Sequence, residues 1–203
     1  MFKREFKNNN TYILDLKDFD LPQTLDCGQA FRWEEKKNGI WCGVAFNKYL
    51  ELQKLSDGTV VLYSTSEKEF NDIWRKYFDL DRDYGKIINA ISSNEILKKA
   101  STYGKGIRIL NQEPFETLCS FIISQNNNIK RIKGIISRLC ENFGEDMGGY
   151  FSFPSAEKIA SLTLDDLAVL RSGFRAKYIL DAAQKVAGGE IDLNQLKSIS
   201  IDE

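Results

Sequence analysis

Residues 114–143 read PFETLCSFIISQNNNIKRIKGIISRLCENF, and this stretch decides how the second half of the chain folds. Pro114 suits a first helical turn, and apolar residues then recur at helical spacing as far as Ile123. A second apolar face runs over residues 129–143, and Gly144 is a natural helix stop. The stretch therefore predicts two helices that meet at three consecutive asparagines.

The three asparagines, Asn126 to Asn128, are more than a turn between two helices needs. Asparagine forms helices poorly and caps them well, so one of the three would serve as the cap of the second helix. Three of them place several amide groups, each both donor and acceptor, at one junction. Such a junction suits the reading of nucleic-acid base edges. A plain polar turn is the alternative, and the residues alone leave both open.

A second unusual turn, Gly173-Phe174-Arg175-Ala176-Lys177, precedes a helix predicted over residues 175–187. An aromatic side chain on a basic turn is what a wedge into a stack of bases requires. Phe174 could equally be a staple that packs into the core. The sequence by itself does not decide between the two.

The chain before residue 101 has a different pattern. Short runs of β-forming residues lie at 11–16, 30–33, 40–46, 49–53 and 60–63. Turn signals at residues 37–39 and 57–58 separate strands as in an antiparallel sheet, and helical periodicity follows from about residue 66. The sequence therefore predicts an α+β fold: a sheet domain with flanking helices at 1–100, then a helical domain at 101–203.

The 203 residues carry 28 basic and 29 acidic side chains, a net charge of −1, and no histidine. The lack of histidine excludes Ser-His-Asp and Cys-His catalysis and histidine-ligated metals. The net charge does not attract the protein to nucleic acid or to a membrane, so any anion-binding surface has to be local. Residues 96–112, 117–140 and 167–180 are basic and contain no acid, which fits either an anion-facing side or ordinary solvated helix faces.

The four cysteines, Cys27, Cys42, Cys119 and Cys140, form no Cys-x-x-Cys pair, so we expect reduced thiols and no metal. The start of the chain has no signal-peptide pattern, and no apolar run is long enough to cross a membrane. We expect a cytoplasmic protein, associated with the nucleoid if it is bacterial.

Four segments together carry a resemblance: Cys27 to Trp33 (CGQAFRW), residues 76–84 (KYFDLDRDY), Ser124 to Ile129, and Gly173 to Tyr178. With these segments, in this order, the chain resembles 8-oxoguanine DNA glycosylases, a branch of the helix-hairpin-helix glycosylase superfamily. Alkyl-base glycosylases share the fold but usually not both the first and third segments. The resemblance implies a twisted sheet domain similar to the TATA-box-binding protein, followed by the first helices of an incomplete glycosylase domain.

The resemblance also implies site residues. The backbone carbonyl of Gly28 would accept a hydrogen bond from N7 of 8-oxoguanine, which carries a hydrogen, whereas N7 of guanine is an acceptor. An acceptor facing an acceptor in a dry pocket costs about 1–3 kcal/mol. Asn126 would fill the gap left by the extruded base, Arg131 and Arg175 would contact the orphaned cytosine, and Phe174 would be the wedge.

The family reaction is excision of 8-oxoguanine opposite cytosine with strand cleavage, and it needs no cofactor. Its lysine nucleophile follows a Leu-Pro-Gly-Val-Gly element, and an aspartate comes about twenty residues later. This chain has no such element and ends at residues 199–203, which resemble a helix start. We therefore expect no catalytic residue and no turnover in these 203 residues alone. A non-catalytic DNA-binding fragment is a further alternative. The expected partner is double-stranded DNA containing 8-oxoguanine, and the expected state is a monomer that does not bind membranes.

Overall fold

The structure of the protein is a computed structural model that describes residues 2–197, and these residues form two compact units. One unit holds the chain up to residue 44 together with 48–111, and the other holds 45–47 together with the chain from 112 onward. Helix α5, Glu95–Tyr103, spans the boundary that we predicted after residue 100. In the part of the chain that is described, no helix has the length and apolar character needed to cross a bilayer.

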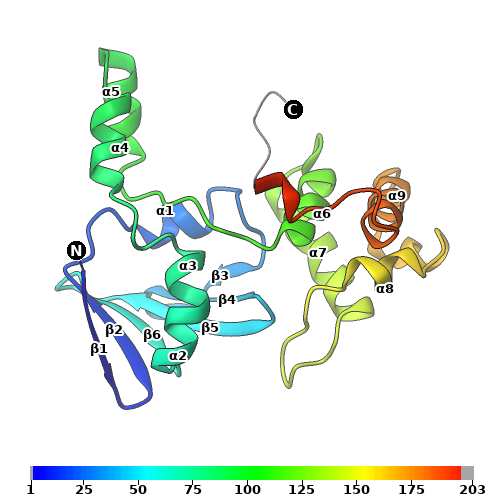
Figure 1. The fold of residues 1–203 in the computed structure, drawn as a ribbon, viewed down its shortest axis with the longest axis horizontal. Helices are drawn as coiled ribbons and strands as arrows, with labels where there is room; N and C mark the ends of the chain where they lie inside the picture. Colours follow the sequence, from blue (N-terminus) through cyan, green and yellow to red (C-terminus); the bar gives the residue numbers. More distant parts are fainter. Residues whose placement is uncertain (1, 198–203) are drawn as a thin grey trace. The chain divides into compact units, whose positions relative to one another are not determined.

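Within residues 2–197, one sheet of six strands forms the framework of the first unit (Figure 1). Its strands are β1 (Lys3–Lys7), β2 (Asn10–Leu14), β3 (Trp33–Glu35), β4 (Ile40–Ala45), β5 (Lys48–Lys54) and β6 (Val60–Tyr63). They lie in the order β1-β2-β6-β5-β4-β3. The pairing is antiparallel, with Tyr12 opposite Val61 and Leu52 opposite Leu62.

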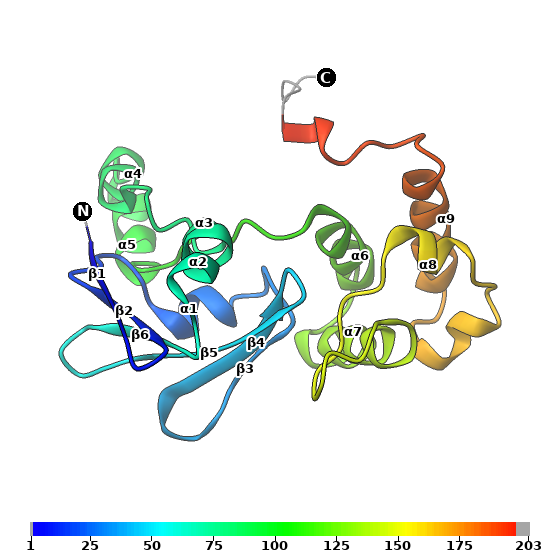
Figure 2. The same cartoon turned by 60° about the horizontal axis from the view of Figure 1, so that its bottom comes forward.

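One helical stretch lies across a face of this sheet (Figures 1 and 2). It comprises α2 (Glu67–Glu69), the π-helical turn η2 (Phe70–Trp74) and α3 (Arg75–Tyr77). The side chains of Trp74 and Phe78 stack with ring centroids 6.1 Å apart, and Trp33 of β3 meets Trp74 edge-on at 6.3 Å. Burial of these large aromatic side chains supplies much of the apolar stabilisation of the unit.

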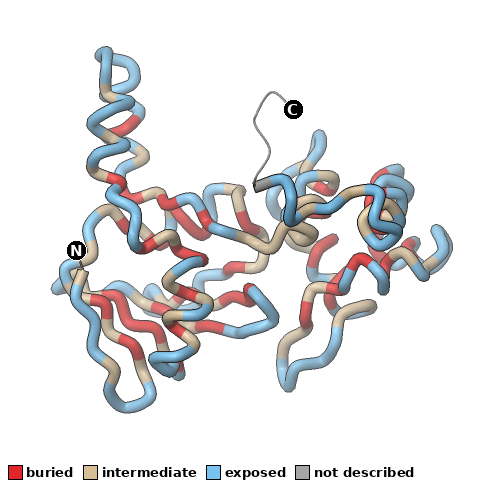
Figure 3. Tube along the Cα trace, viewed as in Figure 1, coloured by how far each residue is buried: buried red, intermediate tan, exposed pale blue. Residues whose placement is uncertain are grey.

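Two short helices form a hairpin after this stretch. α4 (Tyr84–Ile91) is capped by the Asp83 side chain, and α5 is capped by Asn94, whose side chain accepts from the amides of Ile96 and Leu97. The hairpin stands clear of the sheet in Figure 1, and Figure 3 colours most of it as exposed. The short helix α1 (Leu21–Leu25) and the 3-10 turn η1 (Lys37–Gly39) complete the unit.

The second unit is helical. Its elements are α6 (Pro114–Ser124), α7 (Ile129–Phe143), α8 (Ala156–Ala160), η3 (Asp166–Leu170), α9 (Arg175–Ala187) and η4 (Gln195–Lys197). α9 packs against α8 and α6, and α6 also packs against α7. Buried aliphatic side chains such as Ile123, Ile136 and Ile179 form its core. Sheet unit and helical unit together confirm the predicted α+β class.

Two local differences from the sequence predictions stand out. β1 was not predicted, because four of its five residues are charged and only Phe6 is apolar, which leaves no alternating pattern. Residues 30–32 are not in a strand, although their aromatic composition favours one. The helix start predicted at residues 199–203 lies outside the described residues.

Candidate nucleic-acid interface

Two of the three consecutive asparagines shape the α6–α7 junction. The Asn127 side-chain amide donates to the carbonyl of Ile123 (2.9 Å), in the last turn of α6. The Asn128 side chain accepts from the backbone amide of Arg131 (3.0 Å) and so caps α7. The plain-turn interpretation therefore accounts for Asn127 and Asn128.

Asn126 differs from its two neighbours. Its backbone has φ +47°, the left-handed region that asparagine tolerates better than most residues. The residue is exposed, and its side-chain amide hydrogen-bonds to nothing in the described part of the chain. The junction thus presents one unpaired amide, able to donate and to accept, at its tip.

The side chain of Arg175, at the start of α9, is hydrogen-bonded to the backbone of this junction. Its side chain is only 3% exposed, and Nη2 donates to the carbonyls of Gln125 (2.5 Å) and Asn126 (3.1 Å). Nη1 donates to the carbonyl of Ser172 (3.3 Å). One buried guanidinium therefore joins the α6–α7 junction to the turn before α9, which is 49 residues away in sequence.

Phe174 lies on the outer side of this arrangement. Its side chain is 59% exposed, so the interpretation as a core staple is wrong. The Arg175 guanidinium lies 4.6 Å from the ring centroid, and Tyr178 meets the ring edge-on at 6.2 Å. Gly173, with φ +64°, supplies the left-handed turn that brings the ring out. An exposed ring held between two side chains has the stiffness that a wedge needs.

The basic side chains of the second unit fall into two groups. Arg138 and Arg175 serve the fold, since Arg138 donates from Nε (3.0 Å) and Nη2 (2.8 Å) to the Leu170 carbonyl. Near the starts of α7 and α9 the exposed cations are Lys130, Arg131, Arg171 and Lys177, and Lys158 of α8 is exposed as well. Both α7 and α9 begin without an acid in the first turn. Exposed cations and two uncompensated helix N-termini favour an anion such as a DNA phosphate.

Gly28 lies in the first unit, in the loop between α1 and β3 and outside the ladder of the sheet. Its φ of +89° is accessible mainly to glycine. The next side chain fixes the loop: Gln29 Nε2 donates to the carbonyls of Thr24 (2.9 Å) and Arg108 (2.8 Å), and Oε1 accepts from the Leu110 amide (3.0 Å). Sequence reasoning missed this role of Gln29, because its partners at 108–110 lie about eighty residues further along.

The four cysteines differ in access. Cys119 and Cys140 are buried, Cys42 is half-buried, and Cys27 is exposed beside Gly28. Burial raises the pKa of the Cys119 thiol, which keeps it protonated. Over the residues that the structure describes, no three His, Cys, Asp or Glu side chains cluster closely enough to hold a metal ion.

Comparisons with known proteins identify the family of each unit. Residues 119–202 match the HhH-GPD superfamily of base excision DNA repair proteins, which gives the class of the helical unit. Residues 11–118 match the N-terminal domain of 8-oxoguanine DNA glycosylases, and that match covers more than half of the chain. The chain belongs to the 8-oxoguanine DNA glycosylase family.

Three relatives illustrate the similarity. The N-glycosylase/DNA lyase of Saccharomyces cerevisiae is 34% identical over 201 residues, covering 86% of this chain and 51% of the relative. MBOgg1, solved with a low-affinity DNA ligand, is 43% identical with a TM-score of 0.92, covering 98% of this chain and 70% of that one. The Clostridium acetobutylicum 8-oxoguanine glycosylase/lyase was solved with DNA containing cytosine opposite 8-oxoguanine. It is 40% identical with a TM-score of 0.91, and the match covers 98% of this chain and 69% of that one. The chain spans about half the length of the yeast relative.

The structure brings four of the five predicted site residues into one unit. Asn126, Arg131, Phe174 and Arg175 belong to the helical unit, and Gly28 belongs to the sheet unit. The DNA-contact and base-recognition roles assigned to these five residues stay predictions.

Proposed function

We propose that the whole protein excises 8-oxoguanine opposite cytosine from double-stranded DNA and then cleaves the strand. The observation that carries the proposal is the exposed, left-handed Asn126 with its unpaired amide: the buried Arg175 donates to the Asn126 backbone carbonyl and also lies against the exposed Phe174 ring. Base excision requires the nucleotide to leave the stack, because the glycosidic bond is unreachable inside a duplex. An amide that fills the vacated space and a ring that separates stacked bases both lower the cost of that step.

Lesion recognition is proposed for the Gly28 carbonyl. An acceptor at this position favours 8-oxoguanine, whose N7 carries a hydrogen, and disfavours guanine, whose N7 is itself an acceptor. Gln29 supports the role, because its three hydrogen bonds fix the loop and limit the freedom of the neighbouring carbonyl. A carbonyl that could rotate away would lose this discrimination.

Recognition of the opposite cytosine is proposed for Arg131 and Arg175. Cytosine without its partner base exposes O2 and N3, both of which accept from a guanidinium. Arg131 is exposed, and its Nη2 makes one long hydrogen bond, 3.5 Å to the Arg171 carbonyl. Arg175 would have to exchange its bonds to Gln125 and Asn126 for bonds to the base.

The chemical step of the family uses a lysine amine that attacks C1′, displaces the base and forms a Schiff base with the sugar, after which β-elimination breaks the strand. No described lysine is assigned this role. The described residues are assigned the recognition and distortion of the DNA.

Borohydride trapping on an 8-oxoguanine·cytosine duplex tests the proposal with the complete protein. Borohydride reduces the Schiff base to a stable amine, so we expect a covalent protein–DNA adduct on the lesion duplex and none on an undamaged guanine·cytosine duplex. The absence of an adduct, or preferential release of 3-methyladenine from alkylated DNA, would contradict the proposal.

A further inference from the structure

The loop between α1 and β3, residues 26–32, is called the Gly28 loop below, and it is hydrogen-bonded to one short segment of the first unit, residues 106–110. Gln29 makes two of these bonds, since its side chain binds the carbonyl of Arg108 (2.8 Å) and the amide of Leu110 (3.0 Å). Both partners are backbone groups, so the attachment does not depend on the rotamers of the segment. The residue directly after Gly28 is therefore fixed to the backbone of segment 106–110.

Thr24, near the end of α1, makes the corresponding bonds before Gly28. Its hydroxyl donates to the carbonyl of Gly106 (3.2 Å) and accepts from the amide of Arg108 (3.3 Å). Thr24 is 0% exposed, so water cannot take the place of these bonds. Its own carbonyl accepts from Gln29 Nε2 (2.9 Å) and from the Cys27 thiol (3.6 Å). One buried residue thus connects α1, the Gly28 loop and segment 106–110.

The first end of α1 is held against the same segment. The amide of Asp20, the N-cap residue of α1, donates to the carbonyl of Gly106 (2.8 Å). Gly106 has φ +97°, and a Cβ at this position would lie 2.7 Å from Cβ of Asp20. Only glycine permits so close an approach. The helix that leads into the Gly28 loop is therefore fixed to segment 106–110 at both of its ends.

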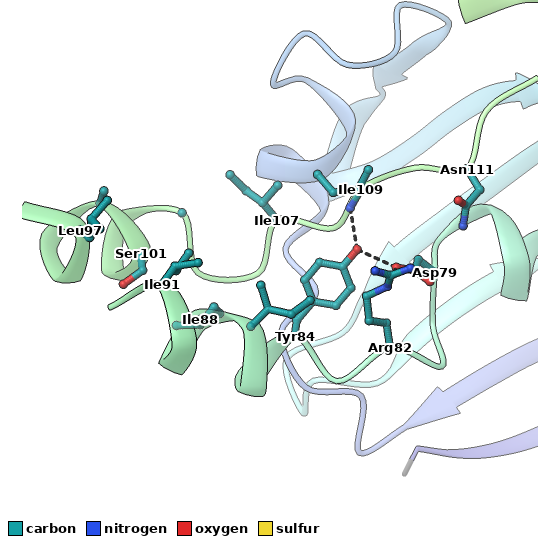
Figure 4. Close-up of a pocket in the computed structure, with 13 residues that line it drawn as sticks. Asp79, Arg82, Tyr84, Ile88, Ile91, Leu97, Ser101, Ile107, Ile109 and Asn111 are labelled. Atoms are coloured by element: carbon teal, nitrogen blue, oxygen red, sulfur yellow. Dashed lines mark hydrogen bonds and ion pairs between the residues drawn. The ribbon is translucent and has the colours of Figure 1, made fainter. Parts of the chain in front are cut away.

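Segment 106–110 is itself fixed to the rest of the unit. Arg108 is 2% exposed, and its guanidinium donates to the carbonyls of Asp79 (2.7 Å) and Lys17 (2.8 Å). The hydroxyl of Tyr84 accepts from the Ile109 amide (2.8 Å) and donates to Asp79 Oδ2 (2.9 Å), as Figure 4 shows. The segment is therefore a rigid support for whatever is hydrogen-bonded to it.

We propose that Thr24 is a positioning residue for lesion recognition. Together with Gln29 it brackets the backbone around Gly28, so that the Gly28 carbonyl keeps one orientation. A carbonyl reads the hydrogen on N7 only while distance and angle are kept, because a hydrogen bond weakens steeply with misalignment. A looser loop would turn the carbonyl away from N7 of guanine and relieve the repulsion between the two acceptors. The inference rests on the function proposed above for the Gly28 carbonyl.

The preference of the complete protein for the lesion tests this role. The probes are two fluorescein-labelled duplexes, one with 8-oxoguanine opposite cytosine and one with guanine, each with a 2′-fluoro sugar at the probed nucleotide to slow excision. Fluorescence anisotropy gives the ratio of the two dissociation constants. Thr24→Val keeps the shape of the side chain but removes the hydroxyl, so it should lower the preference by about fivefold. Thr24→Ser keeps the hydroxyl and should restore the preference.

Thr11→Val is the matched control. Thr11 is also 0% exposed in the first unit, and its hydroxyl donates to the carbonyl of Thr65 (3.1 Å), which lies outside the Gly28 loop and segment 106–110. Urea unfolding should show that Thr11→Val and Thr24→Val are both destabilised, but Thr11→Val should keep the full preference for the lesion. The same ratio in Thr24→Val and Thr11→Val would overturn the proposal, because Thr24 would then serve stability alone.

Gln29→Met extends the test to the other side of Gly28 and covers the case in which Thr24→Val does not fold. It removes the bonds from the Gln29 side chain to the 108 and 110 backbone at similar side-chain length, so it should also lower the preference. A full preference in folded Gln29→Met would show that these attachments do not set lesion recognition, and the proposal would be wrong. Equal binding of both duplexes by the unsubstituted protein would instead contradict the proposed function itself.

Discussion

Asn126 occupies a backbone conformation that few side chains tolerate, at a position where its own side chain makes no contact that would stabilise the fold. Such a side chain contributes little to the stability of the fold, and its amide is available to a partner. Asn127 and Asn128 do stabilise the fold, because the Asn127 side chain bonds a carbonyl in the last turn of α6 and the Asn128 side chain caps α7. Three identical neighbours therefore have separable roles.

Substitution of Asn126 tests this separation. Asn126→Gly should leave the free energy of unfolding unchanged or slightly higher, because glycine adopts φ +47° without strain. Asn126→Ala should lower it by about 1 kcal/mol, because alanine disfavours that region. Both variants should lose affinity for a duplex with a flipped-out lesion, measured by gel shift beside urea unfolding.

Asn38→Gly is the matched control for Asn126, since Asn38 also has a left-handed backbone (φ +65°) in a turn of the other unit. The Asn38→Gly variant should bind the lesion duplex as tightly as the unsubstituted protein does. Full DNA affinity in Asn126→Gly would show that the amide does not fill the space of the extruded base.

Arg131 and Arg175 should respond differently to substitution, although both are assigned to cytosine. Arg131 is exposed, so Arg131→Ala should change the free energy of unfolding by less than about 0.5 kcal/mol. Arg175→Ala leaves the carbonyls of Gln125 and Asn126 without their buried donor and should lower the free energy of unfolding by about 2–4 kcal/mol. Urea unfolding measures the free energy of unfolding of both variants.

Arg131→Ala is therefore the clean test of opposite-base recognition. In the complete protein it should relax the preference for cytosine over adenine opposite the lesion, measured as a ratio of excision rates. An unchanged ratio would mean that Arg131 does not contact the opposite base.

The sequence predicted the two helices that meet at the asparagines, but it did not predict which side chains stabilise the junction and which are exposed. The triple asparagine and the basic aromatic turn were visible as unusual patterns. The burial of Arg175 was not, because no local pattern tells an exposed arginine from one that reaches carbonyls 49 residues away. The role of Gln29 could not be predicted for the same reason, because its hydrogen bonds join segments that are far apart in the chain.

Among the helices, α7 begins with a neutral side-chain cap and with no acid to compensate its dipole. The Asn128 side chain satisfies the Arg131 amide, and the first turn of α7 carries cations and no acid. The cap is neutral, so the positive end of the helix dipole remains available to an anion.

Asn128→Asp and Asn128→Ala separate these two contributions. Asn128→Ala should lower the free energy of unfolding by about 1 kcal/mol, because the cap is lost. Asn128→Asp keeps the cap and should be at least as stable as the natural protein, but its negative charge should weaken duplex binding several-fold. Equal DNA affinity in Asn128→Asp and the unsubstituted protein would show that this helix end does not face phosphate.

The helices α6, α7 and α9 were predicted to within about a residue, because apolar spacing, caps and terminal glycines all agreed. Thr163 and Asp166 form a reciprocal pair of the capping-box type, since Asp166 accepts from the Thr163 amide (2.8 Å) and donates its own amide to the Thr163 hydroxyl (3.2 Å). The pair lies at the approach to the 3-10 turn η3, whose N-cap residue is Asp165, and no α-helix begins there. Strand β1 depends on its pairing with β2, which its charged sequence does not reveal.

Over the whole molecule, near-neutral charge means that the proposed DNA binding would depend on a small local group of cations. The net charge is −1, so the protein as a whole is not attracted to DNA. The exposed cations near the starts of α7 and α9, which are Lys130, Arg131, Arg171 and Lys177, would have to supply the attraction.

The salt dependence of duplex binding should reflect that small number. A contact with about four phosphates gives a slope of about −3 to −4 for log Kobs against log salt. Lys177→Gln should reduce the magnitude of the slope by about 0.9, whereas Lys37→Gln should leave it unchanged. Titrations by fluorescence anisotropy at several salt concentrations measure the slope, and an unaltered slope in Lys177→Gln would place Lys177 away from the backbone of DNA.

The exposed thiol of Cys27 has a practical consequence for anyone who studies this protein in solution. It lies one residue before the carbonyl proposed to sense the oxidised base, whereas Cys119 and Cys140 are buried. A maleimide dye would therefore attach at Cys27 in preference to either of them, without engineering. Its emission could then report in real time when a nucleobase arrives beside that loop.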